Sequence, residues 1–194
     1  MAFRHTGRMS SPLGLAGPVD LSPVELRVLE LDGVVFRVGP AWCSVGEIDG
    51  PALRLRSLCG VLPEGVAAAR RTAAWAWGAT GTAPAPVEAC VDVTRRHTVQ
   101  APGVRVSEVV LPASDLADGD GEGPAVTTPA RTALDLLRGD DWDDGTALLV
   151  SRLVADHGID RADLRDRLGL RRRLPHKRRA LVRLAAVEGL LSRR

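Results

Sequence analysis

The first regular pattern of apolar residues lies at 22–31 and predicts a helix. Ser22 is followed by Pro23, and Glu25 stands three positions after Ser22, which is the arrangement of a capping box with proline in the first turn. The apolar residues of this segment recur every three or four positions, so they share one face of the helix. The helix is expected to run through Leu31.

Two short apolar stretches, 34–38 and 41–45, flank Gly39-Pro40 and predict two strands joined by a tight turn. A helix followed by such a hairpin is the back half of a winged helix, and a complete one needs two further helices in front. Residues 1–20 are rich in glycine, proline and serine and predict a flexible tail, which cannot supply those helices. We therefore predict an incomplete winged-helix-like segment at 21–48.

The next segment predicts two helices. Asp49 is placed to cap the first, Pro51 fits its first turn, and the helix is expected to stop before Pro63. The second is expected at 67–77, with Gly78 as its terminator.

A β region follows. Apolar and mainly polar residues alternate over 87–93, which is the period of a half-buried strand. Residues 104–110 are the expected partner across a turn around Pro102-Gly103, and 125–127 are a candidate third strand. The expected result is a small antiparallel sheet.

The last third of the chain predicts helices. Thr128 and Pro129 provide a cap and a first-turn proline for a helix over 130–138. The acidic residues 140–144 favour the N-terminus of a second helix, because carboxylates stabilise the positive end of the helix dipole. Further helices are expected to end near Asp156, to begin at Asp160, and to run from Pro175 to about Leu191.

These patterns predict the α+β class: a partial winged-helix-like N-terminal part, a central small antiparallel sheet packed with helices, and a helical C-terminal third. The corresponding parts of the chain are a tail at 1–20, the winged-helix-like segment at 21–48, an α/β body at 49–158 and a basic helical C-terminus at 159–194.

Charge is divided unevenly along the chain. Residues 161–194 hold 12 Lys/Arg and 3 Asp/Glu, a net of +9, whereas the first 160 residues hold 14 and 21, a net of −7. Such segregation predicts an end that binds anions. The basic residues would gain affinity for a polyphosphate by releasing its counterions, and the alternative is a solvated basic tail. The candidate nucleic-acid-binding residues here are Arg171, Arg172, Arg173, Lys177, Arg178 and Arg179.

Arg95 and Arg96 follow the first predicted strand of the sheet. A turn at this place could contact phosphate, or it could be a solvated hairpin tip, and the sequence leaves both interpretations open.

Several kinds of chemistry find no motif. A restriction-type nuclease needs two carboxylates and a lysine on adjacent strand positions, but the only lysine is Lys177, in a helical basic run. The histidines are scattered without metal spacing. An acidic loop at 118–123 has Pro129 where a calcium loop needs its bidentate glutamate. We expect no metal, no cofactor and no catalytic activity.

The three cysteines are odd in number and have no C-x-x-C spacing, which favours reduced thiols in the cytoplasm. No apolar run approaches 18 residues, and the N-terminus has no apolar core of a secretion signal. We therefore expect a cytoplasmic protein with no membrane partner.

Three stretches together carry a resemblance to a known family: 71–78, the strand at 86–88 that leads to 94–96, and 126–136. Their order resembles the AbiEi-type antitoxin-like proteins common in actinobacteria, over about residues 24–190. The resemblance implies an N-terminal winged helix that binds DNA, a central AbiEi-like domain, and a role as antitoxin or autoregulating repressor with a toxin as partner. Many relatives continue into an endonuclease-like domain, which this chain is not expected to contain.

The most specific of these stretches contains a predicted structural motif. Thr128 caps the helix, Pro129 fits its first turn, and Arg131 and Asp135 lie four residues apart on one face, where they can pair. Two functional hypotheses follow: an antitoxin-like DNA-binding transcriptional regulator without catalytic activity, or a non-catalytic interaction module that neutralises or scaffolds a partner protein.

Overall fold

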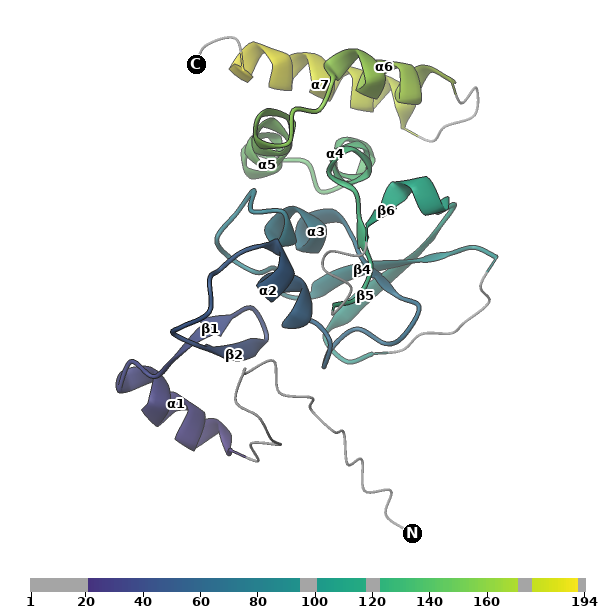
Figure 1. The fold of residues 1–194 in the computed structure, drawn as a ribbon. Coiled ribbons are helices and arrows are strands. Elements are labelled where there is room, and N and C mark those ends of the chain that lie inside the picture. The colour runs from purple at the N-terminus through teal and green to yellow at the C-terminus, as the bar shows by residue number, and fades with distance from the viewer. Residues whose placement is uncertain (1–20, 95–100, 118–122, 171–175, 192–194) are drawn as a thin grey trace.

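The computed structural model describes residues 21–94, 101–117, 123–170 and 176–191, and Figure 1 shows its fold. The predicted tail at 1–20 lies outside these residues. The elements are α1 (Pro23–Leu31), β1 (Val35–Val38), β2 (Ala41–Ser44), α2 (Pro51–Arg56), β3 (Ala67–Ala68), α3 (Arg70–Ala76), β4 (Val87–Asp92), β5 (Val104–Val109), a 3-10 turn (Ala113–Asp115), β6 (Leu116–Ala117), β7 (Val126–Thr127), α4 (Pro129–Arg138), α5 (Asp144–Asp156), α6 (Arg161–Leu170) and α7 (Lys177–Leu191).

The strands form two sheets. β1 and β2 make a separate antiparallel hairpin, while the other five lie in the order β5-β4-β3-β7-β6. Strand β3 is antiparallel to β4 and parallel to β7, and β6 is antiparallel to β7. The α+β class and the helical C-terminal part are confirmed, with a mixed central sheet.

The predicted antiparallel pairing of 87–93 with 104–110 is wrong. Strands β4 and β5 do pair, but in parallel, with Val87 opposite Val104 and Asp92 opposite Val109. Alternation of apolar and polar residues is the same in either direction, so it does not distinguish the two arrangements. The 11 residues between the strands can reach about 36 Å, which is enough to return along a strand of roughly 20 Å.

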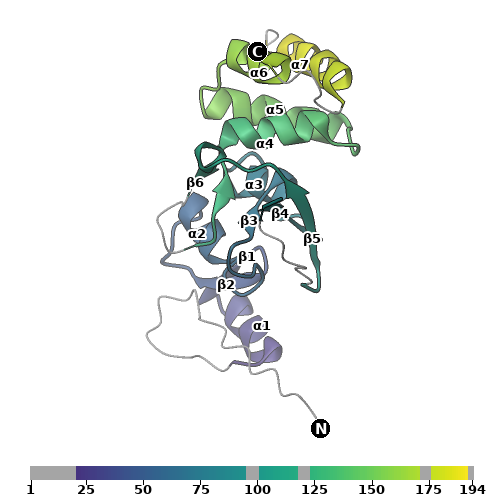
Figure 2. The same ribbon diagram turned by 90° about the vertical axis from the view of Figure 1, so that its right-hand side faces the viewer.

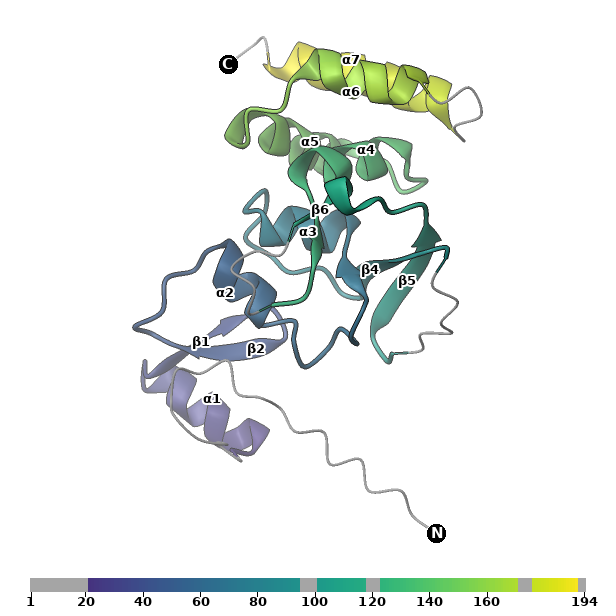
Figure 3. The same cartoon turned by 45° about the vertical axis from the view of Figure 1, so that its right-hand side comes forward.

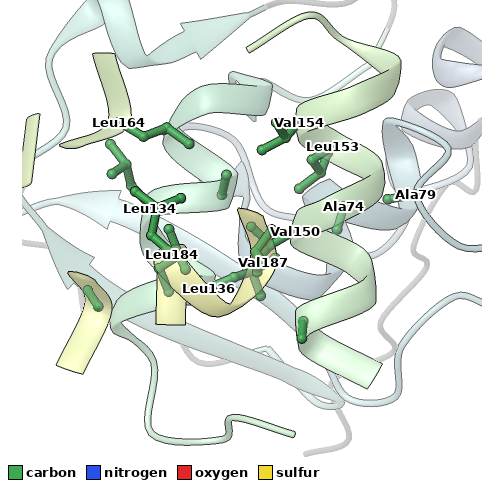
Figure 4. Packing of buried hydrophobic residues seen from close by; sticks show 14 of the residues in the cluster. Ala74, Ala79, Leu134, Leu136, Val150, Leu153, Val154, Leu164, Leu184 and Val187 are labelled. Carbon is green, nitrogen blue, oxygen red and sulfur yellow. The ribbon is translucent and has the colours of Figure 1, made fainter. Parts of the chain in front are cut away.

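Helices α3 to α7 are stacked in layers on one side of the sheet (Figure 2). Helix α3 packs against the sheet, α4 and α5 cover α3, and α6 and α7 form the outermost layer. The side chains that hold these layers together are aliphatic, and they form a single buried cluster (Figure 4). Its members include Ala74, Ala79, Leu134, Leu136, Val150, Leu153, Val154, Leu164, Leu184 and Val187.

A second core joins the sheet to α2 and to the N-terminal hairpin. Trp75 of α3 lies at its centre and is 2% exposed. The hairpin turn packs on this ring at Gly39, where an added Cβ would come within 2.8 Å of the Trp75 ring. The φ of Gly39 is +55°. Glycine at this turn therefore permits both the backbone conformation and the close approach.

The N-terminal unit of α1, β1 and β2 lies at the opposite end of the molecule from α6 and α7 (Figure 3). The two regions proposed from sequence to contact DNA, the helix with its hairpin and the basic C-terminus, are therefore separated by the whole sheet and the α4–α5 layer.

The predicted helix caps are confirmed at α1 and α4. The Ser22 hydroxyl accepts from the backbone N–H of Glu25 at 3.3 Å, and the Glu25 carboxylate accepts from the N–H of Ser22 at 2.7 Å. The Thr128 hydroxyl accepts from the N–H of Arg131 at 3.3 Å, with Pro129 in the first turn.

Three local predictions in the middle segment are wrong. Gly50, not Asp49, is the N-cap of α2, and the Asp49 carboxylate instead accepts two 2.7 Å hydrogen bonds from the Arg54 guanidinium. Helix α2 ends at Arg56, and α3 begins at Arg70 because residues 67 and 68 form strand β3. A two-residue strand is too short to leave an alternating pattern in the sequence.

Candidate nucleic-acid interface

Helix α7 presents three arginines at the surface of the outermost layer. Ala180, Leu184 and Val187 turn inward and are buried in the helical core. On another face of α7 lies an open groove of about 490 Å³. It is lined by Trp142, Arg178, Arg179, Val182, Arg183 and Ala186.

Arg183 fixes the floor of this groove. Its guanidinium lies 4.8 Å from the centre of the Trp142 ring, within cation–π range. The same group donates to the carbonyl oxygens of Leu137 at 2.8 Å and Gly139 at 2.6 Å at the end of α4, where helix geometry leaves carbonyls without an intrahelical partner. Burial lowers the pKa of Arg183 from its usual value, and the charge of Arg179 lowers it further.

Arg179 and Arg178 form the outer edge of the groove. Arg179 donates to the Asp140 carboxylate at 2.6 Å, and this hydrogen bond lowers the pKa of Asp140. Both partners are solvent-exposed, at 41% and 79% of their side chains. Arg178 is exposed and makes no ion pair or hydrogen bond with the described residues. Its charge is therefore available to an external anion.

Lys177 contributes to the fold rather than to the groove. Its Nζ donates to the Gly169 carbonyl oxygen at 2.8 Å, near the C-terminal end of α6. A lysine in this position satisfies a carbonyl at the negative end of the helix dipole.

The other candidate residues have no description. Arg171, Arg172 and Arg173, and likewise Arg95 and Arg96, lie outside the described residues. Of the residues predicted from sequence, the structure therefore brings Arg178 and Arg179 together in one groove, with Lys177 in the first turn of the same helix.

Sequence reasoning missed Trp142 and Arg183. The basic run has no aromatic residue beside it, and Trp142 precedes Arg178 by dozens of positions in the acidic segment before α5. Only the packing of α7 on α4 and α5 brings the ring to the arginines. The single sequence signal for Arg183 is its position, four residues after Arg179 on the same helical face.

The predicted structural motif holds a buried ionic network. Arg131 donates to Asp135 at 2.7 Å, to Asp115 at 2.8 Å and to the Val110 carbonyl oxygen at 3.0 Å. Burial opposes its charge, but the two carboxylates outweigh burial and raise the pKa of Arg131. Arg167 of α6 also reaches Asp115, at 3.3 Å. The motif thus ties α4 to the 3-10 turn and to the outer helices.

The N-terminal unit has a different surface. Helix α1 has no buried residue, and Val24 and Leu31 are 73% and 74% exposed. Its charges are Glu25, Arg27 and Glu30, a net of −1, and Arg27 is ion-paired with Glu30. A helix with this charge does not attract phosphate, whereas its exposed apolar side chains are typical of a protein contact.

A scan of protein-family models finds no family that matches this chain, and a search of curated proteins likewise finds no match. Among the described residues, no helix is long and apolar enough to cross a membrane. No group of three or more metal-ligating side chains is found within the described ranges.

Proposed function

We propose that this protein is an antitoxin-like DNA-binding regulator of the cytoplasm, without catalytic activity of its own. The observation that carries the proposal is the groove on α7, where Arg178, Arg179 and Arg183 lie around Trp142. The resemblance of the central stretches to AbiEi-type antitoxin-like proteins supports the regulatory role.

The charges of the groove suit a phosphate backbone. Arg178 has no partner among the described residues, so it can contact phosphate without breaking an ion pair. The Arg179–Asp140 pair is exposed, and such pairs contribute only about 0–1 kcal/mol. A phosphate oxygen can therefore replace the Asp140 carboxylate at small cost, as guanidinium groups bind both in the same geometry.

Trp142 adds an aromatic surface to these cations. Arg183 already stacks on the ring, so the ring is held in place by a charged group that is itself fixed to the end of α4. An aromatic group flanked by arginines is the composition of surfaces that bind nucleic acid with little sequence preference. We expect this groove to supply affinity rather than base recognition.

Binding to a random-sequence duplex over a series of salt concentrations tests the proposal. Fluorescence anisotropy should give an affinity that falls with salt, with a log–log slope of about −0.9 for each phosphate neutralised. Replacing both Arg178 and Arg179 with alanine should flatten the slope by about 2. Arg161→Ala is the matched control, because Arg161 is an exposed arginine of α6 that pairs with none of the described residues and does not line the groove.

Two results would contradict the proposal. One is the absence of duplex binding by the parent protein at low salt. The other is a double variant whose affinity and salt slope equal those of the parent, since the groove would then make no contribution.

A second function is supported by α1. Its exposed Val24, Val28 and Leu31, and the neighbouring Val34 and Val45, give this unit an apolar surface, and Arg27 of the same helix is ion-paired with Glu30. This surface favours the alternative, an interaction module that neutralises or scaffolds a partner protein. A photo-crosslinking amino acid at Val24 should then give one discrete protein adduct in cells, and the same probe at exposed Glu64 should not.

A further inference from the structure

A second pocket lies between the sheet and the end of α4, and it is separate in its lining from the α7 groove. Its volume is about 210 Å³. Strands β4 and β5 contribute one wall through Ala89, Cys90, Ser107 and Val109. The opposite wall consists of Ala69, Arg70, Asp135, Arg138, Gly139, Asp140 and His176.

Arg70 is the unusual residue of this pocket. Its φ is +51°, the left-handed region that residues with a Cβ rarely adopt. Among the described residues, its buried Nε has no hydrogen-bond partner and Arg70 forms no ion pair. Strained backbone and an unsatisfied buried donor are both unfavourable for folding, and residues held in this way concentrate at binding sites.

The guanidinium of Arg70 is held against the chain at the end of α4. A Cβ placed on Gly139 would overlap Nη2 of Arg70, so a side chain here would displace the end of the arginine. The guanidinium thus lies against a residue of a different element.

The two carboxylates of the lining are already neutralised by other arginines. Asp135 pairs with Arg131 at 2.7 Å and with Arg138 at 3.7 Å, and Asp140 pairs with Arg179 at 2.6 Å. The charge of Arg70 also acts on both carboxylates, but neither forms an ion pair or hydrogen bond with it, so the guanidinium keeps hydrogen-bonding capacity for an anion.

We propose that this pocket binds a small phosphate monoester, with the Arg70 guanidinium as the principal ligand. A guanidinium can donate two parallel hydrogen bonds to an oxyanion. Arg138, His176 and Ser107 supply further donors in the lining. The volume accommodates a phosphate with a few carbon atoms and is below the 300–1,000 Å³ usual for larger ligands.

Isothermal titration of the full chain with inorganic phosphate and with glycerol phosphate, at ionic strength held constant with chloride, tests this site. The parent protein should bind one equivalent of glycerol phosphate and bind it more tightly than inorganic phosphate. Arg70→Gly should weaken binding by at least roughly tenfold through the loss of the charged hydrogen bonds. Glycine suits the φ of +51°, so this variant should melt no lower than the parent.

A second variant examines the same contact from the other side. Gly139→Ala keeps the arginine but places a methyl group where its Nη2 lies, so binding should again weaken. Arg161→Ala is the control for net charge, because Arg161 does not line the pocket, and its titration should match that of the parent.

The proposal is overturned if the parent shows no saturable binding of either phosphate, or if folded Arg70→Gly binds as the parent does. No nucleic acid is present in these titrations, and Arg178→Ala should leave them unchanged. These titrations therefore distinguish a failure of the pocket to bind phosphate from a failure of the α7 groove to bind DNA.

Discussion

The guanidinium of Arg183 lies over the ring of Trp142 while its Nη1 donates to two carbonyl oxygens at the end of α4. This arrangement joins the last helix to the helical layer beneath it. Arg183→Met keeps the aliphatic stem and removes both hydrogen bonds, and we expect it to lower the free energy of unfolding by about 1–3 kcal/mol. Urea denaturation measures the loss, and the stability of Arg183→Lys should lie between that of the parent and that of Arg183→Met.

Arg131 is the residue whose loss should destabilise the fold most. Removing it leaves the carboxylates of Asp115 and Asp135 buried with reduced compensation, and breaking a buried pair costs about 3–5 kcal/mol. Arg131→Met should therefore lower the urea midpoint strongly. Arg167→Met is the comparison. Arg167 also pairs with Asp115, but its side chain is 40% exposed, so this substitution should cost about 1 kcal/mol or less. Equal effects of the two variants would refute the network.

Thr128 is expected to act through its hydroxyl as the cap of α4. Thr128→Ala removes the acceptor for the Arg131 N–H and should lower the free energy of unfolding by about 1 kcal/mol. Thr128→Ser keeps the hydroxyl and should restore most of the stability. A serine variant as unstable as the alanine variant would show that the methyl group, not the cap, matters.

The three thiols should differ in reactivity. Burial raises the pKa of Cys43 to about 11 and that of Cys90 to about 12, so neither forms thiolate near neutral pH. Cys59 is exposed. A thiol reagent at pH 8 should modify one cysteine quickly and the other two only on unfolding, and the fast phase should vanish in Cys59→Ser.

Acid should weaken the link between α2 and its preceding loop. The hydrogen bonds from Arg54 lower the pKa of Asp49 in the folded protein. The pair therefore stabilises the fold fully at pH values above the ordinary aspartate pKa, and this stabilisation is lost as the pH falls through the lowered pKa of Asp49. Asp49→Asn should cost less than about 1 kcal/mol at pH 7, since Asp49 is 47% exposed. The free energies of unfolding of the parent and of Asp49→Asn, measured from pH 7 to pH 3, should converge at the acid end.

The sequence predicted what short-range chemistry determines. The capping box at Ser22 and the cap and proline at Thr128 and Pro129 act within one helical turn, and both caps lie where predicted. The pairing of Arg131 with Asp135 follows from helical spacing in the same way. Asp49 failed as a cap because a competing partner, Arg54, lies five residues along the chain.

What the sequence could not predict depends on distant contacts. The direction of β5 relative to β4 is set by the path of the chain, which alternation does not record. Trp142 reaches the arginines of α7 only through helix packing, and the left-handed conformation of Arg70 has no signature in its neighbours. Trp142 and Arg70, which complete the two proposed sites, were therefore visible only in three dimensions.

The Asp140–Arg179 pair has one partner in each proposed site. Asp140 lines the small pocket, and Arg179 lines the groove on α7. An anion bound beside Asp140 repels the Asp140 carboxylate, whereas a phosphate bound to Arg179 deprives Asp140 of its positive partner. Each ligand thus alters the free energy of the Asp140–Arg179 pair, and so affects the binding of the other ligand. By thermodynamic linkage the effect is reciprocal: the small phosphate changes the affinity for DNA by the same factor as DNA changes the affinity for the small phosphate.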